Sequence, residues 1–172
     1  MTTEEFKIEV VTDLADLPGW IDLNREYLNF AVARHEEATG QVVDPESQLH
    51  QTVSHIDEFL GPDGRFIAAQ NSNGDLIGMV LLHRIANGKG EIKRLFVRPQ
   101  ARGTGLATRL MDRLETEARE MGLIALYLDT SSGLREAINF YAVRGFNEAP
   151  FDPTSVQDPE IAQHLVIMEK LL

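Results

Sequence analysis

The sequence predicts a mixed α/β fold, in which a mostly antiparallel sheet holds one parallel, splayed pair of strands and carries helices on both faces. Segments of strand length, alternating or wholly apolar, recur along the chain and are separated by segments with apolar residues at helical spacing. One strand–helix–strand unit spans residues 91–129, and such a crossover pairs its two strands in parallel. With 172 residues, 43% of them hydrophobic, the chain suits a single domain over residues 1–172.

The first part of the chain predicts one strand and two helices. Residues 6–11 alternate between apolar and polar side chains, which indicates a strand. Asp13 offers an N-cap for a helix whose apolar residues recur at helical spacing over residues 20–31. Pro45 suits the first turn of a second helix, and apolar residues continue its pattern to Leu60, before a glycine- and proline-rich stop.

The middle of the chain predicts a β-meander that leads into a helix and a buried strand. Residues 65–70 and 76–83 flank a turn rich in asparagine and glycine, which is typical of a hairpin, and residues 91–97 add a third strand. Residues 106–121 have an apolar face at helical spacing and end at a glycine. Residues 124–129 are nearly all apolar, as in a strand that is covered on both faces.

The last part of the chain predicts a short helix and two further strands. Residues 134–143 form the helix, an extended segment begins at Phe146, and residues 165–171 form the final strand. The expected order of elements is therefore β-α-α-β-β-β-α-β-α-β-β.

Composition and charge narrow the class of protein. A net charge of −11 argues against general affinity for nucleic acid and favours cationic partners such as amines. No apolar run is long enough to span a membrane, no secretory leader begins the chain, and there is no cysteine, so we expect a cytoplasmic protein without membrane attachment or thiolate metal sites. Residues 89–113 nevertheless hold seven basic and two acidic residues, which indicates a local anion site.

A glycine-containing loop, residues 100–107, follows a predicted strand and opens a predicted helix. Gly103 and Gly105 let a ligand approach the main chain, and free N–H groups in the first helical turn attract anions. The loop lacks the lysine of a P-loop, and Thr108 stands where a dinucleotide fingerprint needs its third glycine. A tight turn without a ligand is the alternative interpretation.

Two segments together resemble the GNAT family of N-acetyltransferases. Residues 100–105 match its acyl-CoA motif Q/R-x-x-G-x-G/A, and residues 137–146 are similar to its A-x-x-x-Y-x-x-x-G-F segment. Residues 91–99 also look like the fourth strand of that family. The resemblance covers residues 76–146 and implies a GNAT-like fold and an acyl-CoA-dependent N-acyltransferase that uses acetyl-CoA and no metal.

The resemblance also implies how the chain binds its donor. The pyrophosphate of coenzyme A would rest on loop amides, the pantetheine arm would pair with the fourth strand, and the N–H of Leu95 or its neighbour would stabilise the oxyanion of the tetrahedral intermediate. The expected cofactor-binding residues are Leu95, Phe96, Val97, Gln100, Arg102, Gly103, Thr104, Gly105, Leu106, Ala107, Thr108 and Asn139. Leu134 departs from the family, which often carries an asparagine there, so a pantetheine contact from that position is not expected.

Direct attack by an amine requires a base and an acid. Glu91 matches the position of the general base in several members of the family, with His83 and Glu26 as weaker alternatives. Tyr141 matches the tyrosine that protonates the departing thiolate of coenzyme A. The sequence therefore predicts Glu91 and Tyr141 as the catalytic pair.

The acceptor is expected to be a primary amine of a small molecule. The first two helices and residues 150–159 would build its pocket, and Arg34 and His35 would suit an acceptor that bears a carboxylate. A protein or peptide N-acetyltransferase, a module that binds coenzyme A without turnover, and an unrelated nucleotide-binding domain are the alternatives. Dimers are common in the family, which leaves a homodimer open.

Overall fold

One seven-stranded sheet organises the computed structural model, which describes residues 5–155 and 161–172. Its strands lie in the order β1-β2-β3-β4-β5-β7-β6. The strands are β1 (Lys7–Val11), β2 (Gly64–Gln70), β3 (Leu76–Arg84), β4 (Lys89–Val97), β5 (Ala125–Ser131), β6 (Asn147–Glu148) and β7 (Leu165–Leu171). All neighbouring strands pair antiparallel except β4 and β5, which confirms the predicted mixed sheet.

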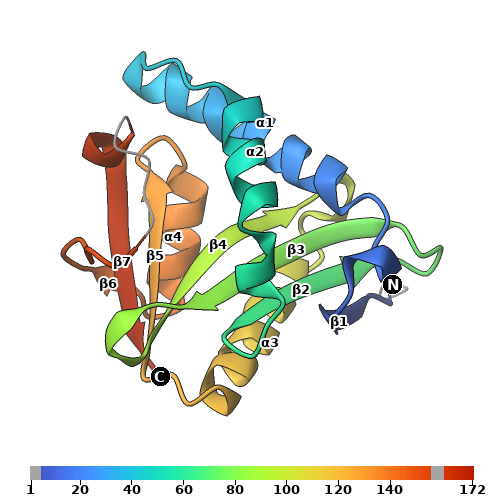
Figure 1. Cartoon of the computed structure of the whole chain (residues 1–172). Coiled ribbons are helices and arrows are strands. Elements are labelled where there is room, and N and C mark those ends of the chain that lie inside the picture. The colour runs from blue at the N-terminus through green and yellow to red at the C-terminus, as the bar shows by residue number, and fades with distance from the viewer. Residues whose placement is uncertain (1–4, 156–160) are drawn as a thin grey trace.

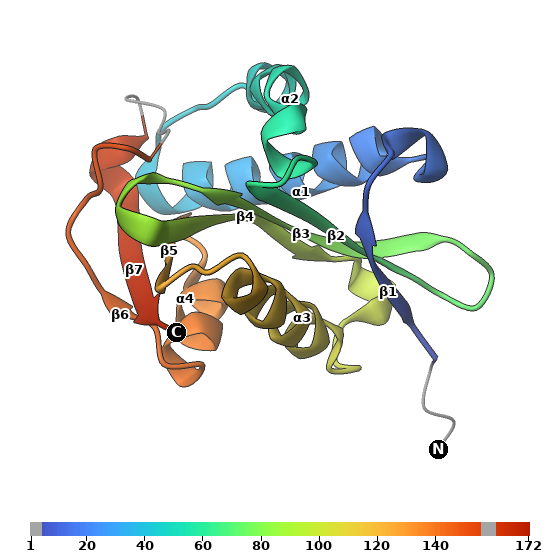
Figure 2. The same cartoon turned by 60° about the horizontal axis from the view of Figure 1, so that its bottom comes forward.

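Helices cover both faces of the sheet. The α-helices are α1 (Trp20–Thr39), α2 (Pro45–Ser54), α3 (Leu106–Glu120) and α4 (Arg135–Val143). Figure 2 shows α1 and α2 on one face and α3 and α4 on the other. The order of strands and α-helices along the chain is the one that the sequence predicts.

The parallel pair of β4 and β5 extends over only part of the two strands. Pairing runs from Lys89 opposite Ala125 to Ile92 opposite Leu128. Beyond Leu128, β5 continues to pair with β7 as far as Ser131, while β4 continues beside β3. The two strands therefore diverge, as Figure 1 shows.

The two faces of the sheet pack against separate hydrophobic clusters. The apolar face predicted for α3 is buried against one face, where Leu106, Leu110, Leu114 and Ala118 are at most 1% exposed. On the other face, Leu23 of α1 belongs to the cluster that contains Phe66 of β2. Because β2 and β3 are covered on both faces, their side chains are buried almost continuously.

Two helix boundaries differ from the predicted ones. The carboxylate of Asp13 accepts a hydrogen bond from the N–H of Ala15 and caps a short 3-10 helix, η1 (Leu14–Asp16), whereas α1 begins only after Gly19 at φ 88°. The second predicted helix stops at His55, whose backbone is not helical, and continues as the 3-10 helix η2 (Ile56–Phe59). In both places a local turn interrupts an apolar pattern that reads as continuous in the sequence.

A buried ionic cluster joins three elements on the α3 side of the sheet. The carboxylate of Glu115 on α3 accepts hydrogen bonds from the ammonium of Lys170 on β7 at 2.9 and 3.0 Å. The guanidinium of Arg144, just after α4, donates to the same carboxylate at 2.9 Å. Burial alone would raise the pKa of Glu115, but the two cations outweigh it and hold that pKa below its usual value.

Replacing Glu115 by glutamine is expected to lower the free energy of unfolding by about 2 kcal/mol at neutral pH, because the partly buried Lys170 ammonium loses its counter-charge and Arg144 is left with Asp112 alone as its ion-pair partner within the described residues. A carboxyl pKa that is lower in the folded state contributes stability above the unfolded value of about 4.3, and the contribution is lost as the pH falls through the folded pKa. Urea unfolding of both proteins should therefore show a difference that is full at neutral pH and shrinks below about pH 4. Glu120→Gln, at an exposed position on the same helix, is the control. If the two proteins differed in free energy of unfolding as much below about pH 4 as at neutral pH, the ion pairs of Glu115 would not be the cause of the difference.

Candidate active site

The carboxyl half of β4 carries a β-bulge where it leaves β5. Met79 pairs with Phe96 and Leu81 pairs with Lys93, so Arg94 and Leu95 together face the single residue Val80. Arg94 has φ 58°. Within the described residues, β5 does not pair with this part of β4, so main-chain groups of β4 face the opening between the two strands.

The loop after β4 forms an anion-binding turn at the start of α3. Gly103 and Gly105 have φ of 77° and 81°, and open space lies where a Cβ atom would stand on either residue. Gly105 is the N-cap of α3 and supplies no side-chain cap, so N–H groups of the first turn point outward. The start of α3 therefore combines backbone N–H donors, open space beside two glycines through which an anion can approach, and the positive end of a 15-residue helix.

The side chains of this loop make different contacts. The Thr104 hydroxyl donates to the carbonyl oxygen of Ala101 at 2.6 Å, and Gln100 is exposed. The Arg102 guanidinium donates from Nε to the carbonyl oxygen of Val97 and lies 5.0 Å from the ring centre of Phe30 on α1. A further open cavity brings together Thr108 and Asn139, two predicted cofactor-binding residues from different helices; it is lined by Thr108, Glu136, Asn139, Phe140, Val143 and Arg144.

An inner cavity of about 120 Å³ lies in the opening between β4 and β5. Residues 92–95 of β4 form one wall and residues 129–131 of β5 another, and α1 covers the cavity. Its other lining residues are Tyr27, Leu28, Ala31, Val32, His35, Val43, Gln48, Leu134, Ala137, Tyr141, Ile161 and Leu165. Leu134, where the family often has an asparagine, therefore presents an apolar side chain to this cavity.

Tyr141 reaches the inner cavity from α4. Its ring is 6% exposed and packs edge-on against Phe140 and Phe146. Among the described residues its hydroxyl has no hydrogen-bond partner, and Tyr141 is one of the residues that line the cavity. Burial, reinforced by nearby Tyr27 and Asp129, raises the pKa of Tyr141, so the phenol keeps its proton at neutral pH.

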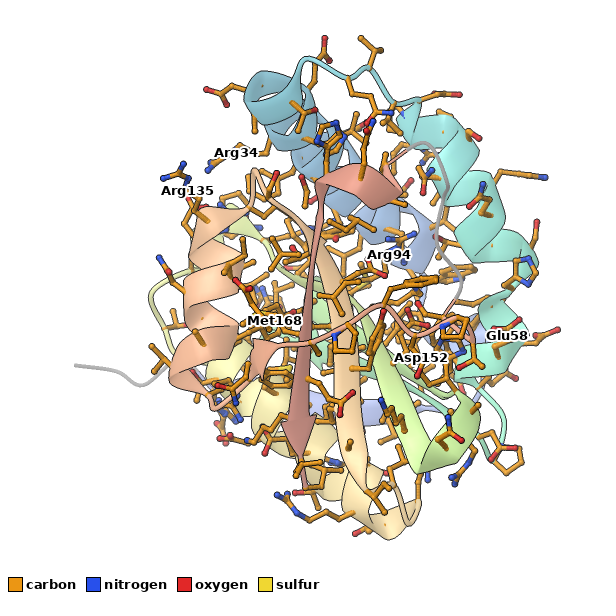
Figure 3. All side chains as sticks on the ribbon, turned by 90° about the vertical axis from the view of Figure 1, so that its left-hand side faces the viewer. Arg34, Glu58, Arg94, Arg135, Asp152 and Met168 are labelled. Atoms are coloured by element: carbon orange, nitrogen blue, oxygen red, sulfur yellow. The ribbon has the colours of Figure 1, made fainter. Side chains whose placement is uncertain are left out.

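A second cavity, the α2 cavity, has a volume of about 450 Å³ and lies between α2, η2 and the sheet. It is lined by Gln48, Gln51, Thr52, His55, Glu58, Phe59, Leu81, His83, Lys93, Arg94, Asp129, Ile161 and Leu165. Lys93, Arg94 and Asp129 border both cavities, so the two are contiguous. Seen from the β7 side, Arg94 lies in the interior near α1 and α2, and Glu58 lies past the end of α2 (Figure 3).

Glu91 is fully buried on β4 and is held by three donors. His83 contacts its carboxylate through Nε2 at 2.9 Å, the Lys93 ammonium lies 3.0 Å away, and the Ser155 hydroxyl donates to it. Burial raises the pKa of Glu91, but these partners together lower it below its usual value. Glu91 is therefore an ionised carboxylate at neutral pH, inside the sheet.

His83 connects Glu91 to the α2 cavity. Among the described residues that line the two cavities, His83 is present and Glu91 is not. The other ring nitrogen of His83, Nδ1, lies 3.3 Å from the carboxylate of Glu58, which is 45% exposed. The alternative base Glu26 lies elsewhere, in a two-point ion pair with Arg98.

The residues expected to receive the acceptor are only partly brought to the cavities. Arg34 is paired with Glu136 at 2.9 Å. His35 borders the inner cavity, but its two ring nitrogens contact Ser131 and Gln41. Residues 156–160 of the expected acceptor loop lie outside the described residues. The sequence did not single out Arg94, Glu58 or Asp129, because no local pattern marks residues that meet only through the bulge and the packing of α2.

Within residues 5–155 and 161–172, no cluster of three or more histidine and acidic side chains is placed to hold a metal ion. Within the same residues, no helix has the length and apolarity that crossing a membrane requires.

Comparison with known proteins identifies the family. The family model of the acetyltransferase (GNAT) family matches residues 22–146. The chain is 33% identical over 145 residues to an IAA acetyltransferase of Azospirillum brasilense, covering 73% of this chain and 90% of the relative. It is also 36% identical over 84 residues to an aminoalkylphosphonate N-acetyltransferase of Salmonella typhimurium, covering 46% of this chain and 54% of that protein.

Solved structures agree on the fold. An acetyltransferase of the GNAT family from Staphylococcus aureus superposes with a TM-score of 0.74 at 18% identity, covering 97% of this chain and 99% of that one. PaiA N-acetyltransferase from Thermoplasma acidophilum, in complex with coenzyme A, has a TM-score of 0.71 at 22% identity and covers 96% and 99%. From the family match, the relatives and the parted strands of its sheet, we conclude that this chain belongs to the GNAT family and is an acyl-CoA-dependent N-acyltransferase.

Proposed function

We propose that the chain transfers the acetyl group of acetyl-CoA to a primary amine of a small molecule, which attacks directly in a ternary complex. The observation that carries this proposal is the junction of two cavities, one lined by Tyr141 and the other by His83. A donor in the first cavity and an amine in the second would meet beside Lys93, Arg94 and Asp129, which border both. Such placement supplies much of the acceleration of a reaction between two substrates.

The loop before α3 and the bulge in β4 provide the groups that would bind acetyl-CoA. The open space at Gly103 and Gly105 and the uncapped start of α3 fit a pyrophosphate. Arg102 adjoins Gly103 in the same loop, and Thr108 of the first helical turn borders an open cavity with Asn139. Main-chain groups of Leu95, Phe96 and Val97, unpaired with β5, suit the amides of a pantetheine arm. The bound thioester supplies the acetyl group.

The proton transfers follow from burial. Tyr141 holds its proton at neutral pH and has no competing partner within the described structure, so it donates to the departing thiolate. Glu91 does not border either cavity within the described residues; its carboxylate accepts a hydrogen bond from the Nε2–H of His83, which leaves the lone pair of Nδ1 to take the proton of the amine. The Glu58 carboxylate lies 3.3 Å from Nδ1, and the ammonium group of an incoming acceptor would displace it from the imidazole.

Small acceptors are favoured because the acceptor side lies beneath α2. The Salmonella relative is an aminoalkylphosphonate N-acetyltransferase, and a small amine as its substrate is consistent with this choice. Acetyl-CoA consumption measured across simple amines, polyamines, amino acids and basic peptides tests the proposal. Turnover of peptides alone would favour the protein-acetylating alternative, and coenzyme A binding without turnover of any amine would overturn the proposal. Cytoplasmic location and dimerisation stay predictions.

Tyr141→Phe is expected to lower kcat about 100-fold while changing the dissociation constant of coenzyme A less than about threefold, because only a proton donor is lost. Steady-state kinetics and calorimetry with coenzyme A measure the two effects. Gly103→Val is the matched variant with the opposite profile: a side chain at φ 77° strains the loop, so binding should weaken more than turnover. Equal loss of binding in both variants would exclude the acid role of Tyr141.

The two accounts of the base give different pH–rate profiles. If Glu91 takes the proton itself, Glu91→Gln should depress kcat/KM most at low pH. If His83 takes it, Glu91→Gln should lower kcat/KM by a similar factor across the pH range, because the imidazole loses the carboxylate that orients it. We expect the second result, with a loss of about 100-fold in His83→Gln.

Glu26→Gln is the control for both variants, because Glu26 is ion-paired with Arg98 away from His83. It should retain both the rate and the shape of the profile. A profile of His83→Gln that matches the unchanged protein would contradict the role of His83.

A further inference from the structure

Arg94 occupies an unusual place in the chain. Among the described residues only two other than glycine have positive φ, Asn87 in a turn and Arg94 within a strand. A strand residue in this conformation is strained and persists where the surrounding structure holds it. The bulge turns the Arg94 side chain to the junction of the inner and α2 cavities, both of which it borders.

The guanidinium of Arg94 is held in one orientation by neutral groups. Its Nε and Nη2 donate to the hydroxyl oxygen of Thr52 on α2 at 3.3 and 3.0 Å. That hydroxyl gives its own proton to the carbonyl oxygen of Gln48 at 3.0 Å, so its lone pairs are left for Arg94. The guanidinium also lies 5.6 Å from the ring centre of Tyr27.

No carboxylate among the described residues lies within ion-pair distance of Arg94. Neighbouring arginines differ: Arg98 is paired with Glu26 at 2.7 Å and Arg34 with Glu136 at 2.9 Å. In a chain of net charge −11, a half-buried guanidinium to which the described part of the chain supplies no counter-charge stands out. Since two donors of its planar fork are used by Thr52, other donors remain for an anion in the cavity.

A negative charge lies at the other end of the α2 cavity. Glu58 lines it beside His83, the proposed proton acceptor, whereas the two further charged residues Lys93 and Asp129 lie 3.8 Å from each other. A cation is therefore favoured near the imidazole and an anion near the guanidinium. This distribution matches a zwitterion, with an ammonium at one end and an acid group at the other.

Resting on the proposed function, we infer that the acceptor is an amine that carries an acid group, a carboxylate or a phosphonate, and that Arg94 binds this group. Arg94 is thus a specificity-determining residue: it orients the acceptor so that the amine reaches His83. Thr52 is a positioning residue that acts through Arg94.

The test compares matched acceptors with the full chain and acetyl-CoA. β-Alanine and 2-aminoethylphosphonate carry an acid group, and propylamine is the counterpart of similar length that lacks one. We expect kcat/KM for the better acid to exceed that for propylamine by about 100-fold, and Arg94→Gln to reduce this ratio to nearly one. Arg94→Lys should recover part of the ratio, since the charge stays but the fork is lost. The preferred acid reports which of the two groups the site takes.

Two further variants keep the inference falsifiable. Thr52→Val should lower the ratio in the same direction but less, because the guanidinium loses its anchor and keeps its charge. Arg98→Gln, the matched control at an ion-paired arginine nearby, should leave the ratio unchanged. Thermal unfolding of every variant establishes that it is folded.

The outcomes separate the two proposals. Acetylation of propylamine as efficient as that of both acids, or an equal loss for all acceptors in Arg94→Gln, would overturn the inference and leave the acetyltransferase proposal standing. A selective rise in the KM of acetyl-CoA in Arg94→Gln would assign Arg94 to the donor and also overturn it. No acetyl-CoA consumption with any amine would overturn the proposed function, and the inference with it.

Discussion

The parting of β4 from β5 after Ile92 and Leu128 is the constraint on which the rest of the site depends. Backbone groups of two parallel strands normally satisfy one another, and leaving them unpaired in the interior costs free energy unless water or a ligand takes their place. The sheet tolerates the opening because β3 still pairs with β4 and β7 still pairs with β5. The inner cavity is the space that this opening leaves.

The helices on the two faces of the sheet bring further side chains to the site. On one face, α4 brings Tyr141 to the inner cavity, while the Glu115 cluster ties α3, β7 and the end of α4 together. On the other face, α1 and α2 close over the bulge and place Thr52 against Arg94. Each functional side chain is therefore set by packing between elements that are distant in the sequence, which gives the site a defined geometry before any substrate arrives.

Buried charges in the site are compensated by hydrogen bonds and by neighbouring groups of opposite charge. Burying the Glu91 carboxylate is unfavourable by itself, and the hydrogen bonds and charge of His83, Lys93 and Ser155 offset that cost. The pair of Glu91 and His83 thereby presents an oriented imidazole to the α2 cavity. Arg94 is the exception to compensation among the described residues near the cavities, and this exception distinguishes the acceptor side from the ion pairs on the surface.

Sequence by itself determined the order of strands and helices, the parallel crossover, and the turn at Gly103 and Gly105, because periodicity, glycine spacing and helix termini are local properties. It misplaced the start of α1, since a cap at Asp13 also suits a single 3-10 turn. Only the tertiary structure decided that His83, rather than Glu91, borders the α2 cavity within the described residues, and that Arg94 also borders it with no counter-charge from residues 5–155 and 161–172. Both facts arise from strand register, a bulge and helix packing, which join residues far apart in the chain and leave no local pattern in the sequence.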